Sequence, residues 1–204
     1  MATLLLDFSP RPKMNLKESL NQFTPPVYGR TQRSAATYST VAQHCKTHLV
    51  ALVQEYGQVQ NDQQLLRELR NDMDYYLRRY HKYCIEERDS MGAHYREIGA
   101  DAETDFEHLI PAARVRDLLL SESITVEQAL NAPTVRLSRI KHAMLKEAGW
   151  ASSTPDMWLP FRRYSQVFDA QFETHDGVVV DTETWTLQKH FEYFDHLNIK
   201  EQLI

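Results

Sequence analysis

The sequence has little glycine, little cysteine and no long hydrophobic run. Its 204 residues include six glycines and no GxGxxG or GxxxxGK(S/T) string, which argues against a glycine-rich loop that binds nucleotide phosphates. Two cysteines, Cys45 and Cys84, are too few for a disulfide framework or a four-thiolate zinc site. No apolar run reaches the roughly 18 residues of a membrane span, so we expect a cytoplasmic protein without a membrane partner.

The composition is otherwise that of an ordinary globular chain, with 42% hydrophobic and 25% charged residues. The formal net charge of −5 conceals a gradient, because residues 110–166 are basic and residues 167–204 are strongly acidic. Overall acidity argues against a protein that wraps nucleic acid without specificity, but it leaves room for a local basic cleft.

The first 92 residues divide into an arm and a helical hairpin. Residues 1–35 contain four of the eight prolines and little periodicity, which predicts an extended arm. Apolar residues at three-and-four spacing then predict two helices within residues 36–92, the first ending at Gly57 and the second capped by Asn61 or Asp62. Residues 75–83 interleave tyrosines with basic residues, a pattern that suits either a core edge or contacts with nucleic acid.

The remainder alternates short strands and helices, so we predict an α+β fold with a central unit over residues 93–168 and a C-terminal hairpin plus helix over residues 169–204. We read residues 90–104 as a connection. The predicted strands are residues 106–110 and 134–137, with a hairpin over 171–174 and 178–181; the predicted helices are 112–120, 125–130, 139–148 (capped by Ser138), 156–168 and 184–197.

Two histidines stand in surroundings that suit metal-assisted chemistry. His108 follows Glu107 at the end of a predicted strand, and His142 lies one turn into a predicted helix. Glu107 offers a hard oxygen ligand, His142 offers an imidazole ligand, and His108 remains available as a base. Such a set suits hydrolysis of a phosphodiester, although each residue alone also suits a purely structural role.

The strings over residues 105–115 and 135–145 resemble the two halves of the HNH, or ββα-metal, nuclease fold. They are particularly similar to small bacteriophage-type HNH proteins, which continue into a Trp- and Pro-rich turn and an Arg-Tyr helix, here residues 155–164. The resemblance covers about residues 80–166. It implies that residues 93–168 form an HNH-like module that hydrolyses DNA, double-stranded DNA first of all, in the host cytoplasm if a phage encodes the protein.

Carried onto this chain, the resemblance implies Glu107 and His142 as ligands of Mg²⁺ or Mn²⁺ and His108 as the general base. The family orients its base with an asparagine. Asn131 is the only nearby asparagine, it precedes His142 by 11 residues, and Thr134 lies closer to the expected place. Glu replaces the commoner Asp or His as the first ligand. The side chains expected to bind nucleic acid along the phosphate path are Arg139, Lys141, Arg162 and Arg163.

Two other functions remain open from the sequence. The first is a catalytically inactive HNH-like or helical protein that acts as an adaptor or phage structural component, with a protein partner bound through residues 1–35 or the aromatic residues 184–204. The second is a DNA-binding regulator whose residues 125–148 imitate a helix-turn-helix, although the strand-like residues 134–137 argue against it. Metal-dependent cleavage separates the nuclease from both.

Overall fold

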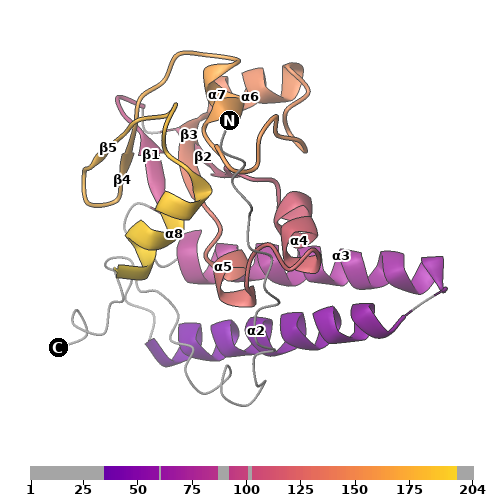
Figure 1. The fold of residues 1–204 in the computed structure, drawn as a ribbon. Helices are drawn as coiled ribbons and strands as arrows, with labels where there is room; N and C mark the ends of the chain where they lie inside the picture. Colours follow the sequence, from indigo (N-terminus) through magenta and orange to yellow (C-terminus); the bar gives the residue numbers. More distant parts are fainter. Residues whose placement is uncertain (1–34, 60, 87–91, 101–102, 197–204) are drawn as a thin grey trace, which may run out of the picture.

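The computed structural model describes residues 35–59, 61–86, 92–100 and 103–196. The arm predicted over residues 1–35 thus lies outside the described residues, apart from Ala35. Within the described ranges the chain forms seven α-helices, one π-helix and a single five-stranded mixed sheet (Figure 1). The predicted α+β class is confirmed.

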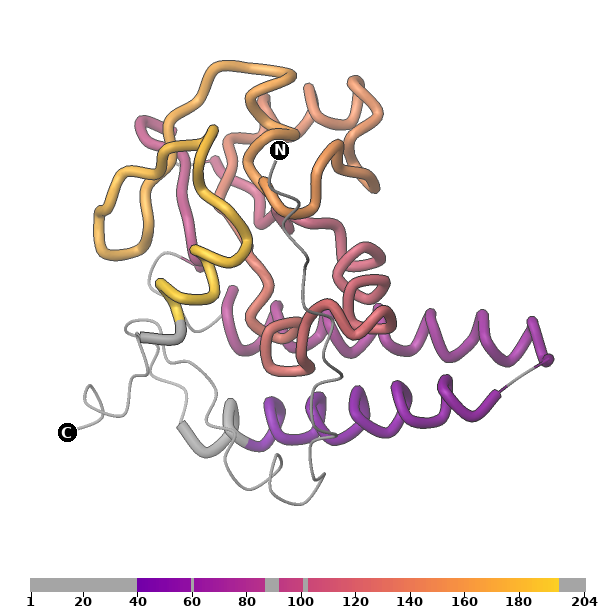
Figure 2. The backbone as a smooth tube through the Cα atoms, viewed as in Figure 1, coloured from indigo at the N-terminus to yellow at the C-terminus, as the bar shows by residue number. Residues whose placement is uncertain are grey.

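Two long helices form one side of the molecule. Helix α2 (Ala35–Gln58) and helix α3 (Gln63–Tyr80) run side by side in opposite directions and are joined at one end by a short connection (Figure 2). Asp62 caps α3, because its side chain accepts a hydrogen bond from the Leu65 backbone N–H at 3.0 Å. Helix α3 continues into a π-helical turn, η1 (His81–Glu86), where the sequence predicted an unbroken α-helix.

The sheet has the strand order β2-β3-β1-β4-β5. Strands β2 and β3 are antiparallel, β3 and β1 are parallel, and the remaining neighbours are antiparallel. Strand β1 lies within residues 90–104, so the prediction that this segment is only a connection is wrong. A strand of three residues is too short for an alternating pattern to show in the sequence. The strands are β1 (Tyr95–Glu97), β2 (Thr104–His108), β3 (Thr134–Ser138), β4 (Phe172–Thr174) and β5 (Val179–Val180).

The shorter helices follow the predicted order with two local corrections. Ser138 occupies the N-cap of α6 without a side-chain cap, and its backbone N–H instead donates to Glu97 Oε2 at 2.9 Å. The helix predicted over residues 156–168 shrinks to α7, because Asp156 accepts backbone N–H bonds at 2.8 and 3.3 Å and so holds a turn in its place. The helices are α4 (Ala112–Leu120), α5 (Val126–Leu130), α6 (Arg139–Glu147), α7 (Arg162–Ser165) and α8 (Leu187–His196).

Two hydrophobic clusters hold these elements together. One joins α2, α3, η1, α4 and α5, and the other lies between the sheet, α6 and α7. Helix α8 and the residue pair before it connect the clusters, since Leu187 and Phe191 pack into the first while Trp185 and Phe194 pack into the second. These four aromatic and aliphatic side chains are at most 3% exposed, so they belong to the core and not to a partner-binding surface.

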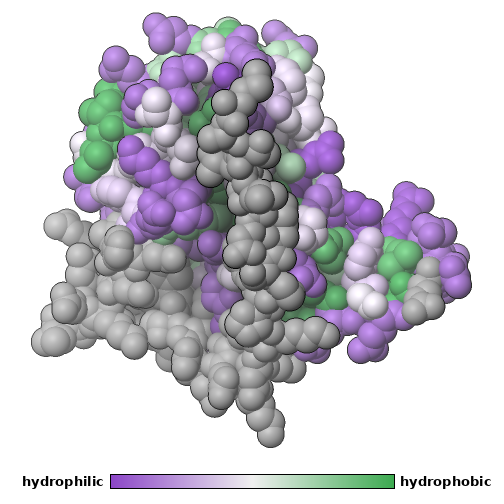
Figure 3. Space-filling view, in the orientation of Figure 1, coloured by the Kyte–Doolittle hydropathy of each residue, from purple (hydrophilic) through white to green (hydrophobic). Residues whose placement is uncertain are grey.

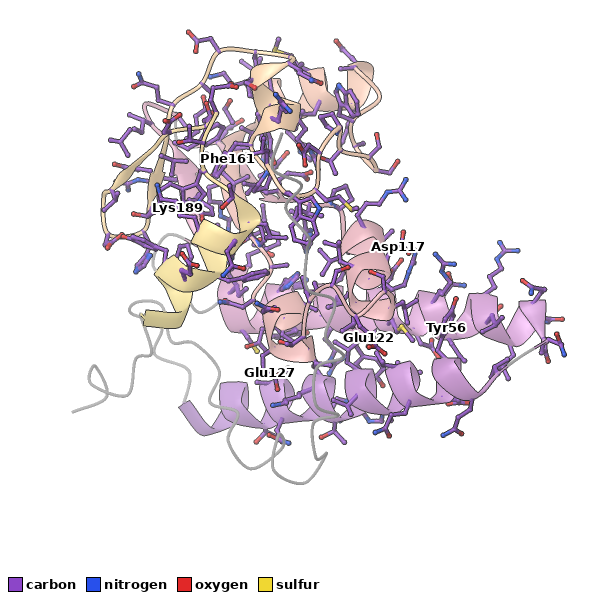
Figure 4. The ribbon with its side chains drawn as sticks, in the orientation of Figure 1. Tyr56, Asp117, Glu122, Glu127, Phe161 and Lys189 are labelled. Carbon is purple, nitrogen blue, oxygen red and sulfur yellow. The ribbon has the colours of Figure 1, made fainter. Side chains whose placement is uncertain are left out.

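Charged groups and surface apolar groups are distributed unevenly around this core. Glu127 on α5 pairs with the buried Lys46 of α2 at 2.6 Å, and Asp117 on α4 pairs with Arg70 of α3 at 2.7 Å (Figure 4).

The face shown in Figure 3 is largely hydrophilic, with apolar side chains gathered over the β4–β5 hairpin, where Val178 and Val179 are exposed. Within the described ranges, no helix has both the length and the apolar character needed to cross a bilayer.

Candidate functional site

The candidate site is built on the end of strand β2, which is an edge strand of the sheet. Successive residues of a strand point to opposite faces, so Asp105 and Glu107 share one face while Phe106 and His108 share the other. Helix α6 packs on β2 and β3 and brings His142 to the Glu107 face. His108 on the opposite face meets His81 of η1. The two halves of the site therefore lie on opposite faces of one edge strand.

On the first face, His142 lies between two carboxylates. Its Nδ1 is 2.7 Å from Asp105 Oδ2, and its Nε2 is 3.3 Å from Glu107 Oε2. Because a carboxylate accepts, Nδ1 donates its proton to Asp105, and Nε2 faces the Glu107 carboxylate. The hydrogen bond from His142 also holds the pKa of Asp105 below its usual range.

This separation is what two ligands of one ion require. Metal–ligand bonds of about 2.0–2.2 Å at angles near 90–110° place two ligand atoms roughly 3.0–3.5 Å apart. The backing contact from Asp105 is the usual way a protein fixes the tautomer of a metal-binding histidine. The fold thus brings together Glu107 and His142, the two residues predicted as metal ligands. Asp105, which contacts His142 from behind, was not predicted, although its position two residues before Glu107 on a strand places both on the same face.

Arg163 holds the other oxygen of Glu107. Its Nη2 donates to Glu107 Oε1 at 2.5 Å, and its Nη1 donates to the His108 backbone carbonyl at 3.1 Å. The side chain is fully buried, so the prediction that Arg163 lines the phosphate path is wrong. Its guanidinium is instead an internal counter-charge that orients Glu107, and its bond to the His108 carbonyl fixes the end of β2.

On the second face, a chain of hydrogen bonds fixes the ring of His108. His81 Nε2 lies 3.1 Å from the Leu130 backbone carbonyl, and His81 Nδ1 lies 2.8 Å from His108 Nε2. The carbonyl only accepts, so His81 carries its proton on Nε2 and accepts at Nδ1, and His108 must then donate from Nε2. The lone pair of His108 is left on Nδ1. Burial lowers the pKa of His81 to about 4 and holds the pKa of His108 well below its ordinary value, so both rings are neutral.

Asn131, expected to orient His108, serves another histidine. Its side-chain oxygen lies 3.0 Å from His94 Nε2, and its backbone carbonyl accepts from His190 Nε2 at 2.8 Å. Thr134, the other candidate, lies 2.9 Å from His94 Nδ1. The orienting prediction is therefore wrong for Asn131, because the C-terminal end of α5 turns its side chain toward the segment that precedes β1. No sequence signal marks His81 as the replacement.

The three other predicted nucleic-acid contacts are all close to carboxylates. Arg139 lies 3.3 Å from Glu103, Lys141 lies 2.8 Å from Glu97, and Arg162 lies 3.6 Å from Asp156. Arg139 and Arg162 remain well exposed, whereas Lys141 is partly buried. The charge that each offers to a phosphate is offset by its neighbour.

The described side chains around Glu107 and His142 offer few donors to the implied metal. Among the described residues, no three His, Cys, Asp or Glu side chains converge on one point. Asp105 lies behind the imidazole of His142, so the pair of facing donors is Glu107 Oε2 and His142 Nε2. Two protein ligands fit an ion such as Mg²⁺, which keeps several waters and takes further oxygens from a bound phosphate.

No protein-family model matches this chain, and the curated proteins and solved structures compared with it yield no match either. The functional assignment therefore depends on the geometry of the site.

Proposed function

We propose that the protein is a divalent-metal-dependent, HNH-like endonuclease that hydrolyses phosphodiester bonds of DNA. The observation that carries the proposal is the facing pair of Glu107 Oε2 and His142 Nε2 at 3.3 Å, each held from behind, by Arg163 and Asp105 respectively. The antiparallel pair β2–β3, with α4 and α5 inserted between the strands and α6 following β3, supports the ββα arrangement that the resemblance implies.

Glu107 and His142 would hold Mg²⁺ or Mn²⁺. The ion supplies charge that shields a non-bridging phosphate oxygen and stabilises the leaving 3′-oxygen. Arg163 pairs directly with Glu107 and holds its carboxylate in place. Asp105 keeps the lone pair of His142 on Nε2, where a ligand is needed.

His108 acts as the general base. Its Nδ1 carries the lone pair and accepts a proton from the attacking water, while Nε2–H remains bonded to His81. A neutral base is required at working pH, and the lowered pKa of His108 meets that requirement. Because His108 and Glu107 project from opposite faces of β2, a phosphodiester that meets both would lie at the end of this strand, next to the point where Arg163 bonds the His108 carbonyl.

The alternatives are less well supported. Residues 134–138 form the strand β3 between α5 and α6, so a helix-turn-helix is not present in the segment that the regulator hypothesis needs. The adaptor hypothesis needs an accessible aromatic surface, but Trp185, Phe191 and Phe194 are buried in the core. Its other proposed contact, residues 1–35, lies outside the described residues apart from Ala35.

The test is cleavage of a supercoiled plasmid in Mg²⁺, in Mn²⁺ and in EDTA. We expect nicking or linearisation with metal, and a loss of at least about 100-fold in rate for His108→Ala, because general bases contribute about 10²–10⁴-fold. Glu107→Gln should weaken Mn²⁺ binding measured by calorimetry. His44→Ala, an exposed histidine on α2, is the matched control. A well-folded wild-type protein that cleaves nothing in either metal contradicts the proposal.

A further inference from the structure

A basic surface lies at the junction of α3 and η1. Arg78 in the last turn of α3 and Lys82 in η1 are both exposed and stand four residues apart, on either side of His81. Within the described part of the chain, no carboxylate lies within ion-pair distance of either. Asp74, one turn before Arg78, is already bonded to Arg116 at 2.7 Å. These two cations are therefore available to an external anion.

The rest of the aromatic and basic segment over residues 75–83 is engaged internally. Arg79 donates to the Tyr75 hydroxyl at 2.8 Å, and its guanidinium lies over the rings of Tyr75 and Tyr83 at 5.9 and 5.5 Å. Tyr80 is fully buried in the core. Within this segment Tyr80 thus belongs to the core, while Arg78 and Lys82 are exposed.

This surface adjoins the proposed base. Arg78 precedes His81 by three residues, about one helical turn, and His81 touches His108 at 2.8 Å. Burial is the main cause of the lowered pKa of His108, and the positive charges of neighbouring groups, Arg78 among them, add to it. The cations on the α6 side are offset by Glu103, Glu97 and Asp156, whereas those on the η1 side are not.

We propose that Arg78 and Lys82 bind backbone phosphates of the DNA strand on the His108 side of the scissile bond. The α3–η1 junction then forms the substrate-binding wall across β2 from α6. This inference rests on the proposed function, since it names the part of the substrate that the same site holds. Phosphate contacts of this kind position the duplex without reading its sequence.

The experiment is fluorescence anisotropy with a labelled 20-base-pair DNA duplex, in EDTA, over a series of salt concentrations. Arg78→Gln and Lys82→Gln should each weaken binding about tenfold at 0.1 M salt and lower the slope of log affinity against log salt by about one, whatever the duplex sequence. Arg67→Gln is the matched control, because Arg67 is equally a surface arginine of α3 but lies three turns earlier. Its affinity and slope should equal those of the wild type.

Equal effects of Arg78→Gln and Arg67→Gln, or no salt-dependent binding by the wild type, would overturn the inference. Binding in EDTA and plasmid cleavage in metal fail independently. If the wild type cleaves DNA and Arg78→Gln binds it normally, the phosphate-binding role of Arg78 is rejected and the nuclease proposal stands. A wild type that never cleaves removes the nuclease, whatever the binding data show.

Discussion

Replacing His81 with leucine removes the acceptor for the Nε2–H of His108, whereas replacing it with glutamine leaves a side-chain oxygen to accept. The His108 ring in His81→Leu must then either bury an unpaired N–H or move its proton to Nδ1. The second choice places a proton where the proposed reaction needs a lone pair. The perturbation therefore acts on the tautomer of a ring that the substitution itself does not touch.

The size of the effect follows from the cost of an unsatisfied buried donor, about 1–3 kcal/mol. At about 1.4 kcal/mol per factor of ten, the Nδ1 lone-pair tautomer falls about 5- to 150-fold relative to its partner. We expect kcat for DNA cleavage to fall by the same range in His81→Leu, with KM nearly unchanged, and to recover to within a few-fold of wild type in His81→Gln.

The assay that decides the matter is long-range ¹H–¹⁵N NMR of the imidazoles, because nitrogen shifts report which atom of His108 carries the proton whether or not the protein cleaves DNA. Wild type and His81→Gln should show the Nε2–H form, and His81→Leu a shift toward Nδ1–H. The reasoning is refuted if wild-type His108 carries its proton on Nδ1, or if His81→Leu retains the Nε2–H form together with wild-type kcat.

Three stability predictions follow from the described contacts. Leu77→Ala should lower the free energy of unfolding by about 2–5 kcal/mol in urea titrations, because Leu77 is wholly buried in the helical cluster. Burial lowers the pKa of His81 to about 4 and that of His190 to about 3. Below pH 6.5 these two rings therefore bind protons in the unfolded chain but not in the native state. The free energy of unfolding should fall by about 1.4 kcal/mol per pH unit for each ring as the pH drops from 6.5 toward 4. Arg163→Leu should cost about 3–5 kcal/mol by stranding Glu107, and adding Glu107→Gln should restore part of it.

Each of these has a contrary result. A loss below about 1 kcal/mol for Leu77→Ala would mean that the helices separate from the core without cost. Stability that is level from pH 6.5 to 4.5 would show that the buried histidines are already charged. Additive losses in the Arg163→Leu, Glu107→Gln double variant would show that the two side chains do not pair.

The sequence predicted elements well where a regular period or a cap marked them. Helix α4 has the bounds that its apolar spacing indicates, and the turn at Gly177 joins β4 to β5 as the His-Asp-Gly string indicates. Strand β1 was missed because its neighbours, β3 and β4, are distant in the sequence, and pairing with them rather than local propensity makes Tyr95–Glu97 a strand.

In the candidate site, too, residues within the motif could be predicted from the sequence, whereas residues outside it could not. Glu107 and His142 lie on β2 and on the helix α6 that follows its partner strand β3, in two strings that a motif can indicate. His81 and Arg163 reach the site from two elements that the motif does not include, η1 and α7. Their positions depend on how the two hydrophobic clusters pack against the sheet, and nothing in the local sequence around either residue predicts that packing.

The span from Glu107 to Arg163 also sets a sequence of events during synthesis. A ribosome releases the chain N-terminal end first, so Glu107 and His142 emerge before the arginine that holds them, and β1 emerges well before its partner β4. Until those downstream residues leave the exit tunnel, Glu107 has no counter-charge and the sheet lacks one flank. Glu107, His142 and Arg163 can therefore take up their described arrangement only when nearly all of the described chain has been made.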